Sequence, residues 1–162
     1  MHRFQARSVL LLLCSAGGQL YAMESRHVVE VIPRVHLRPV VNLPKPVAGV
    51  FSYRGMTVPV IDLCLLIHGE PSGGQLSSRI IMVSSRQEAD QSQQILGLLS
   101  EGVTDTLSQS LSAFSDPGLS TDERSWLGGM YLDERGMVQL LHLEQLLRQL
   151  LQMQPLQEMV PG

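Results

Sequence analysis

Residues that could support catalytic or metal chemistry are present in this sequence, but their spacing does not form a recognisable site. The histidines show no i,i+2 or i,i+4 pair along the chain: His2, His27, His36, His68 and His142. Common zinc sites use such pairs or a Cys-x-x-Cys element, whereas Cys14 and Cys64 stand alone in apolar runs. We therefore expect no metal, no cofactor and two buried thiols.

Covalent catalysis and phosphate binding have no local motif either. Serines are plentiful, but the sequence contains no Gly-x-Ser-x-Gly elbow and no glycine-rich phosphate loop. The catalytic alternative that stays open is a hydrolase whose triad is assembled in space and uses His142. We expect the protein not to be an enzyme.

Composition favours a protein that works by contact with other proteins. The chain has 162 residues, of which 44% are hydrophobic and only 17% charged, with a formal net charge of -3. That length fits one domain or two small subdomains that share contacts. Lys45 is the only lysine and the arginines are scattered, so no basic stripe indicates a nucleic-acid partner.

The first sixteen residues allow two interpretations. A basic start, a short apolar run and small residues before Gly17 resemble a signal peptide cleaved after Ala16. The apolar run is too short to span a bilayer, so we expect no direct membrane insertion. The favoured interpretation is a buried strand over 8–14, which turns at Gly17-Gly18 and pairs with 19–23.

Short apolar runs between Gly and Pro turns predict a mainly β fold of about eight to ten strands. This spacing is typical of small barrels and not of a βαβ sheet. One helix is predicted late in the chain, where Leu143, Leu146, Leu147, Leu150 and Leu151 form a single apolar stripe. Residues 67–75, rich in Gly and Pro, are the predicted subdomain boundary.

The segment from Gly49 to Leu63, Gly-Val-Phe-Ser-Tyr-Arg-Gly-Met-Thr-Val-Pro-Val-Ile-Asp-Leu, resembles the signature of the CheW family. The positions that match this signature in identity and spacing are Gly49, Arg54, Gly55, Pro59, Asp62 and Leu63. Ser52 replaces the usual Asn, and Tyr53 replaces the usual Leu. Further resemblance lies in 21–24, 28–31, 97–107 and 126–129 and in the closing helix, so it runs from about residue 9 to 151.

This resemblance implies a single CheW-like domain over 8–152, made of two SH3-like five-stranded β-barrels. We place the first barrel at about 8–71 and the second at about 76–152, with 153–162 as a frayed tail. It implies a non-catalytic adaptor that bridges methyl-accepting chemoreceptor cytoplasmic tips and the regulatory domain of a histidine kinase. The protein would be cytoplasmic and recruited to membrane receptor arrays; the alternative is a secreted β-barrel binding module, if residues 1–16 are removed.

Four residues are predicted to bind the partner protein: Glu30, Tyr53, Arg54 and Gly55. Arginine at a hairpin tip is either a solvated charge or an interface anchor, a role in which it is enriched. Glu30 lies in the family's early motif, and we expect it to pair with Arg54 and to orient it. Tyr53 departs from the family pattern beside this arginine, which suggests that it tunes which partner is accepted.

The other marked residues are predicted to shape the backbone. Turns or strand ends are expected at Gly49, Pro59, Asp62, Gly97, Gly102 and Asp105. A proline inside a strand run indicates an edge strand or a bulge, because it cannot donate to the hydrogen-bond ladder.

Overall fold

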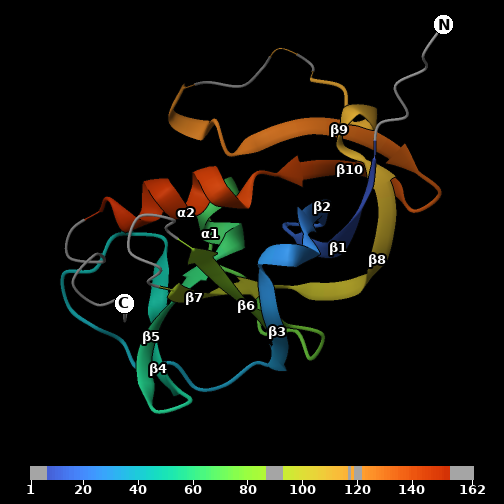
Figure 1. Ribbon diagram of the computed structural model, residues 1–162. Coiled ribbons are helices and arrows are strands. Elements are labelled where there is room, and N and C mark those ends of the chain that lie inside the picture. Colours follow the sequence, from blue (N-terminus) through green and yellow to red (C-terminus); the bar gives the residue numbers. More distant parts are fainter. Residues whose placement is uncertain (1–6, 87–92, 117, 119–121, 154–162) are drawn as a thin grey trace, which may run out of the picture.

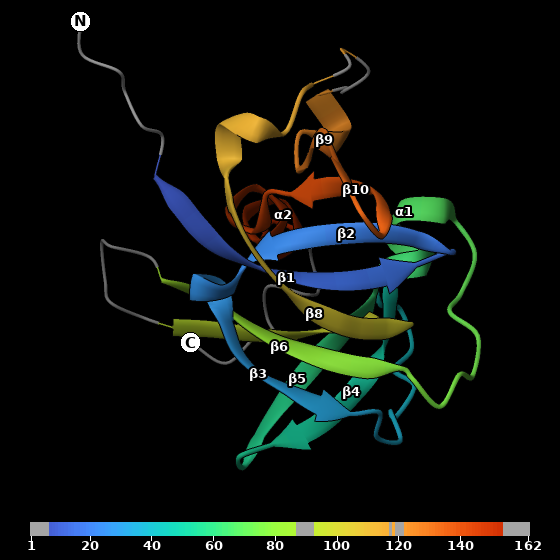
Figure 2. The same ribbon diagram turned by 90° about the vertical axis from the view of Figure 1, so that its right-hand side faces the viewer.

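Ten strands form two five-stranded sheets in the computed structural model, which describes residues 7–86, 93–116, 118 and 122–153. The first, called the terminal sheet, has the spatial order β8 (Gly102–Ser110), β1 (Ser8–Ala16), β2 (Gln19–Glu24), β10 (Gly136–Leu141), β9 (Leu127–Asp133). The second, called the central sheet, has the order β3 (Val28–Pro33), β6 (Arg79–Arg86), β7 (Gln93–Ser100), β5 (Met56–Asp62), β4 (Val47–Tyr53). Figure 2 shows the two sheets one above the other. The mainly β prediction is confirmed.

The predicted division of the chain near residue 71 does not match the sheets. The terminal sheet combines β1 and β2 from the start of the chain with β8, β9 and β10 from its end, and the central sheet contains β3 to β7. The physical reason is long-range pairing. β1 pairs antiparallel with β8, and β2 pairs parallel with β10, which are contacts that local turn signals do not indicate.

The buried apolar side chains of the described residues form three clusters, one of which joins the two sheets. One is built from central-sheet residues and another from the terminal sheet with Phe114. The largest lies between the sheets and combines strand residues with α1 (Leu63–His68), Trp126 and α2 (Leu143–Leu151). Figure 1 shows the two helices where the sheets meet. Because this cluster draws on both sheets, they share a core.

The leucine stripe of the last helix is confirmed. Its five leucines are all at most 7% exposed, and they pack in the cluster between the sheets. Burial of one such side chain contributes roughly 1.5–3 kcal/mol, so α2 is a main stabiliser of this seam. Tyr21 adds a polar contact across the seam, with its hydroxyl 3.1 Å from Nε2 of His68 on α1.

The start of the chain forms the strand that the sequence predicts. β1 lies between β8 and β2, and the turn at Gly17 and Gly18 has positive φ at both residues, as a type I′ hairpin turn requires. Leu11, Leu13 and Cys14 on this strand are completely buried. Cleavage after Ala16 would therefore remove a central, buried strand.

Several local predictions need correction. A 3-10 turn covers Ser25–His27, and Val28 begins β3. The short helix α1, Leu63–His68, is not predicted from the sequence. Gly97 lies within β7 and Asp105 within β8, so neither occupies a turn. Residues 154–162 of the expected frayed tail lie outside the described residues.

Pro59 is not on an edge strand, because β5 lies between β4 and β7. Its partner on β4 is Val50, whose backbone N–H and C=O are bonded to Arg38 on the other side. The Val50–Pro59 pair is therefore a non-hydrogen-bonded pair, and β4 needs no donor from Pro59. Pairing with β7 begins one residue later, at Val60, so Pro59 lies next to the end of the β5–β7 ladder and not inside it.

Candidate partner-binding site

The tip of the β4–β5 hairpin fixes the backbone of the two residues at the centre of the candidate site. Arg54 has φ 51° and Gly55 has φ 80°, and a type I′ turn requires positive φ at both of these positions. Gly55 supplies this conformation without strain, and nothing lies within 4 Å of the position its Cβ would take. Arg54 is one of two described non-glycine residues with positive φ.

Left-handed backbone costs a residue with a Cβ roughly 1–2 kcal/mol, so its use at Arg54 points to a constraint from the surroundings. The guanidinium supplies one: Nη2 donates to Oε1 of Glu30 at 3.1 Å, and Cζ lies 5.0 Å from the centroid of the Tyr53 ring. The Arg54 side chain is nevertheless 61% exposed. The predicted pairing of Glu30 with Arg54 is present, and the guanidinium remains available to a partner.

Tyr53 adds a contact that the sequence did not predict. Its ring is 5% exposed and packs in the central-sheet cluster, while its hydroxyl donates to Oε1 of Glu30, the same oxygen that accepts from Arg54. Burial, followed by the hydrogen bond to this carboxylate, raises the pKa of Tyr53 to about 12. The phenol therefore stays protonated at physiological pH and holds Glu30 in place.

The residues predicted to shape the backbone have different local roles. Asp62 caps α1: its Oδ1 accepts from the backbone N–H groups of Cys64 and Leu65 at 3.0 and 3.3 Å. Gly102 begins β8 after a bend, and its N–H donates to Ser100 Oγ. Gly49 is not at a turn. It lies in β4, where an added Cβ would be 2.8 Å from the carbonyl oxygen of Arg38.

Gly97 and Asp105 also differ from their predicted roles. An added Cβ at Gly97 would lie 2.8 Å from Cγ2 of Ile80, so this glycine permits close packing inside the central sheet. The Asp105 carboxylate is 3.7 Å from the guanidinium of Arg135, at the β9–β10 turn. Both contacts join residues that are far apart in the sequence, which turn chemistry does not predict.

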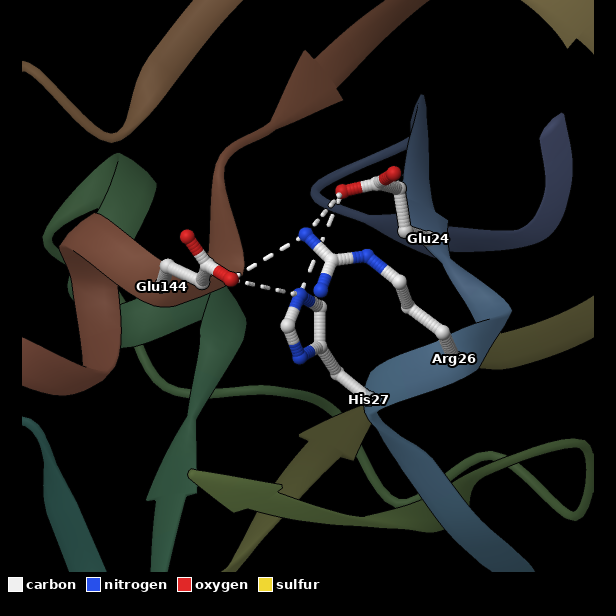
Figure 3. A network of polar contacts seen from close by, with 4 residues as sticks. All are labelled: Glu24, Arg26, His27 and Glu144. Carbon is white, nitrogen blue, oxygen red and sulfur yellow. Dashed lines mark hydrogen bonds and ion pairs between the residues drawn. The ribbon is translucent and has the colours of Figure 1, made fainter. Parts of the chain in front are cut away.

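A second polar cluster, shown in Figure 3, joins the connection between the two sheets to the first turn of α2. Nη2 of Arg26 lies 3.2 Å from Glu24 and 3.1 Å from Glu144. Nε2 of His27 is buried without a hydrogen-bond partner among the described residues, 3.9 Å from Glu24 and 3.7 Å from Glu144. Burial, then the Arg26 charge, lowers the pKa of His27, while the two carboxylates oppose this shift.

Among the described residues, no group of three or more His, Cys, Asp or Glu side chains could hold a metal ion. Cys14 and Cys64 are both free and buried, and burial raises the pKa of the Cys14 thiol to about 12. His142 lies between β10 and α2, where its backbone N–H donates to the carbonyl oxygen of Trp126. Nor is any helix in the described part of the chain long and apolar enough to cross a membrane.

Comparison with known proteins identifies the family. The model of the CheW-like domain matches residues 10–151, which is most of the chain. The chain belongs to the CheW-like domain family. The crystal structure of the scaffolding protein TtCheW from Thermoanaerobacter tengcongensis is similar, with a TM-score of 0.69 and 22% sequence identity over 87% of this chain and 88% of that one. The comparison with curated proteins gives no match.

CheW family membership confirms the resemblance found in the sequence and the expected fold of two SH3-like subdomains. It also establishes a non-catalytic protein of the chemotaxis scaffold class, so the expectation that this CheW-like chain is not an enzyme is confirmed. Partner-binding roles for Glu30, Tyr53, Arg54 and Gly55 remain predictions, for which the geometry above provides a physical basis.

Proposed function

We propose that this CheW-like protein couples the cytoplasmic tips of chemoreceptors to a CheA-type histidine kinase, by binding the receptor tip and the regulatory domain of the kinase. The observation that carries the proposal is the arrangement of Arg54. Its guanidinium is exposed at a hairpin tip and is held by Glu30 and by the face of Tyr53. Arginine anchors of this kind are enriched among the residues that dominate interface energies.

Preorganisation lowers the cost of using Arg54 as an anchor. Immobilising a flexible side chain on binding costs roughly 0.5–1.5 kcal/mol, and contacts made beforehand reduce this cost. The pair is exposed on both sides, with Arg54 at 61% and Glu30 at 39%, so its effect on folding stability is small. The function of the Arg54–Glu30 pair is to set the direction of the guanidinium.

Tyr53 is proposed to influence which partner is accepted. A leucine at this position, as in the family pattern, would leave Glu30 without its second donor and Arg54 without an aromatic face. Partners that meet the Arg54 tip would then encounter a less constrained guanidinium. We propose that the protein acts in the cytoplasm and is recruited to receptor arrays at the membrane through these contacts.

A titration against the kinase regulatory domain and against a receptor-tip fragment from the same organism tests the proposal. Wild-type protein is expected to bind both, and Arg54→Glu is expected to lose kinase-domain binding. Arg148→Glu is the matched control, since Arg148 is exposed on α2 away from the hairpin. Failure of the wild type to bind either partner would refute the function. Equal kinase binding by the Arg54→Glu and Arg148→Glu variants would refute the site.

A further inference from the structure

The outer edge of β4 carries an open pocket of about 620 Å³ whose lining is partly apolar and partly polar. Pro39, Val40, Val41 and Phe51 contribute to the apolar part. Val41 lies at a turn and is 84% exposed, and Val40 is 38% exposed. Valines exposed beside a pocket indicate a surface that binds an apolar side chain favourably, because binding removes apolar area from water.

The edge of the central sheet at this pocket is only partly paired. Arg38 forms an isolated bridge with Val50, through hydrogen bonds of 2.8 and 3.0 Å. Backbone groups alternate in direction along a strand, so Ser52 is the next residue of β4 whose N–H and C=O face this edge. Ser52 lines the pocket as well. An extended segment entering here can pair with Ser52 and place one side chain in the hollow.

The stretch of chain around the pocket has a net positive charge, whereas the whole protein has a net negative charge. Residues 31–61 contain Arg34, Arg38, Lys45 and Arg54 but none of the 15 Asp and Glu residues, although the chain has a net charge of -3. Arg54 pairs with Glu30, and Arg34 donates to the carbonyl of Gly73. Arg38 lines the pocket and has no ion-pair partner among the described residues.

We propose that this pocket binds an extended acidic segment of a partner protein, with an apolar side chain against Val40 and Val41 and a carboxylate at Arg38. The inference rests on the proposed function, because it assigns a chemistry to one of the partners of the scaffold. A peptide fits better than an anionic membrane for two reasons. The apolar groups line a hollow that accepts a side chain, and the remaining chain carries an excess of acidic residues that an anionic bilayer repels.

A fluorescence anisotropy titration with a labelled peptide of alternating glutamate and valine tests this inference. Peptides that alternate lysine with valine, or glutamate with serine, are the probe controls. Arg38→Glu is expected to weaken binding of the Glu/Val peptide at least about tenfold and Val41→Ser about fivefold, with weaker binding at higher salt. Both residues are exposed, so these variants are expected to fold, and Arg148→Glu serves as the matched protein control.

The inference is overturned if the Glu/Val peptide does not bind, if a control peptide binds as well, or if Arg38→Glu and Arg148→Glu behave alike. It is also overturned if phosphatidylglycerol vesicles bind with the same dependence on Arg38 and Val41 and displace the peptide, because a membrane would then be the occupant. Peptide binding that persists in a protein unable to bind kinase or receptor would retain the pocket and reject the proposed function. Kinase and receptor binding without peptide binding would support the proposed function and reject the peptide-binding pocket.

Discussion

Arg54 and Glu30 are 24 residues apart in the sequence, and their side chains meet at 3.1 Å between the tip of the β4–β5 hairpin and β3, which forms the opposite edge of the central sheet. The same Glu30 oxygen accepts the hydroxyl of Tyr53, which is almost completely buried. An exposed guanidinium is therefore connected through one carboxylate to the core of the central sheet.

Glu30 is expected to act on the partner only through Arg54. Arg54→Gln is predicted to weaken kinase-domain binding at least about tenfold, and Glu30→Ala about threefold, because the guanidinium loses its fixed direction. The double variant should bind no more weakly than Arg54→Gln alone. Calorimetric titration of the four proteins forms the cycle, and additive losses would mean that Glu30 contacts the partner independently.

Tyr53→Phe removes only the hydroxyl that donates to Glu30. Loss of a hydrogen bond to a charged acceptor is expected to lower the free energy of unfolding by about 1.5–3 kcal/mol. Tyr131→Phe is the control, since the Tyr131 ring is partly buried in the terminal sheet and its hydroxyl has no bond to another described residue. Urea unfolding measures both, and an equal change in the two variants would assign no special role to the Tyr53–Glu30 contact.

Gly97→Ala is predicted to destabilise the protein by about 1–3 kcal/mol, because the new methyl group would overpack the central-sheet core. Its Cβ would lie 2.8 Å from Ile80 Cγ2 and 3.1 Å from Val60 Cγ2. Gly74→Ala has nothing within 4 Å of the new Cβ and should leave the midpoint of thermal unfolding nearly unchanged. Equal midpoints of thermal unfolding for Gly97→Ala and Gly74→Ala would show that the central sheet accommodates the new methyl group without loss of stability.

Local features were predictable wherever neighbouring residues determine the structure. The Gly17-Gly18 turn, the Arg54-Gly55 hairpin and the leucine stripe of α2 all follow from turn chemistry or periodicity over a few residues. Asp62, for which the sequence predicts a turn or strand end, is the last residue of β5 and caps α1. The pairing of Glu30 with Arg54 came from the family motif and not from spacing.

Features that depend on long-range pairing were missed. Sheet membership could not be read from the sequence, since β1 lies beside β8, and β2 runs parallel to β10. The sequence predicts a turn at Gly97 because glycine permits both a turn and close packing, and only the position of Ile80 distinguishes them. Glu144 reaches Arg26 across 118 residues, a contact that no local pattern indicates.

The cluster of Glu24, Arg26, His27 and Glu144 predicts a specific pH dependence. The pKa of His27 is lowered in the folded protein, so the unfolded chain binds a proton more readily than the folded one as the pH falls below the usual value of 6.5. The contribution of neutral His27 to stability is therefore complete above about pH 6.5 and decreases as the pH falls towards its folded-state pKa.

His27→Gln should remove this component, so its free energy of unfolding should fall less than that of the wild type between about pH 7 and about pH 5.5. His36→Gln, at an exposed position in the β3–β4 connection, is the control and should follow the wild type. Urea unfolding at several pH values measures the difference. A wild-type slope retained in His27→Gln would show that other groups cause the pH dependence.

Simultaneous binding of kinase and receptor is the central claim, and co-sedimentation with receptor-containing vesicles tests it most directly. The kinase is expected to pellet with the vesicles only when this protein is added, and Arg54→Glu should leave the kinase in the supernatant while Arg148→Glu should not. A kinase that pellets equally well without the protein, or a protein that releases the receptor when it binds the kinase, would contradict the account.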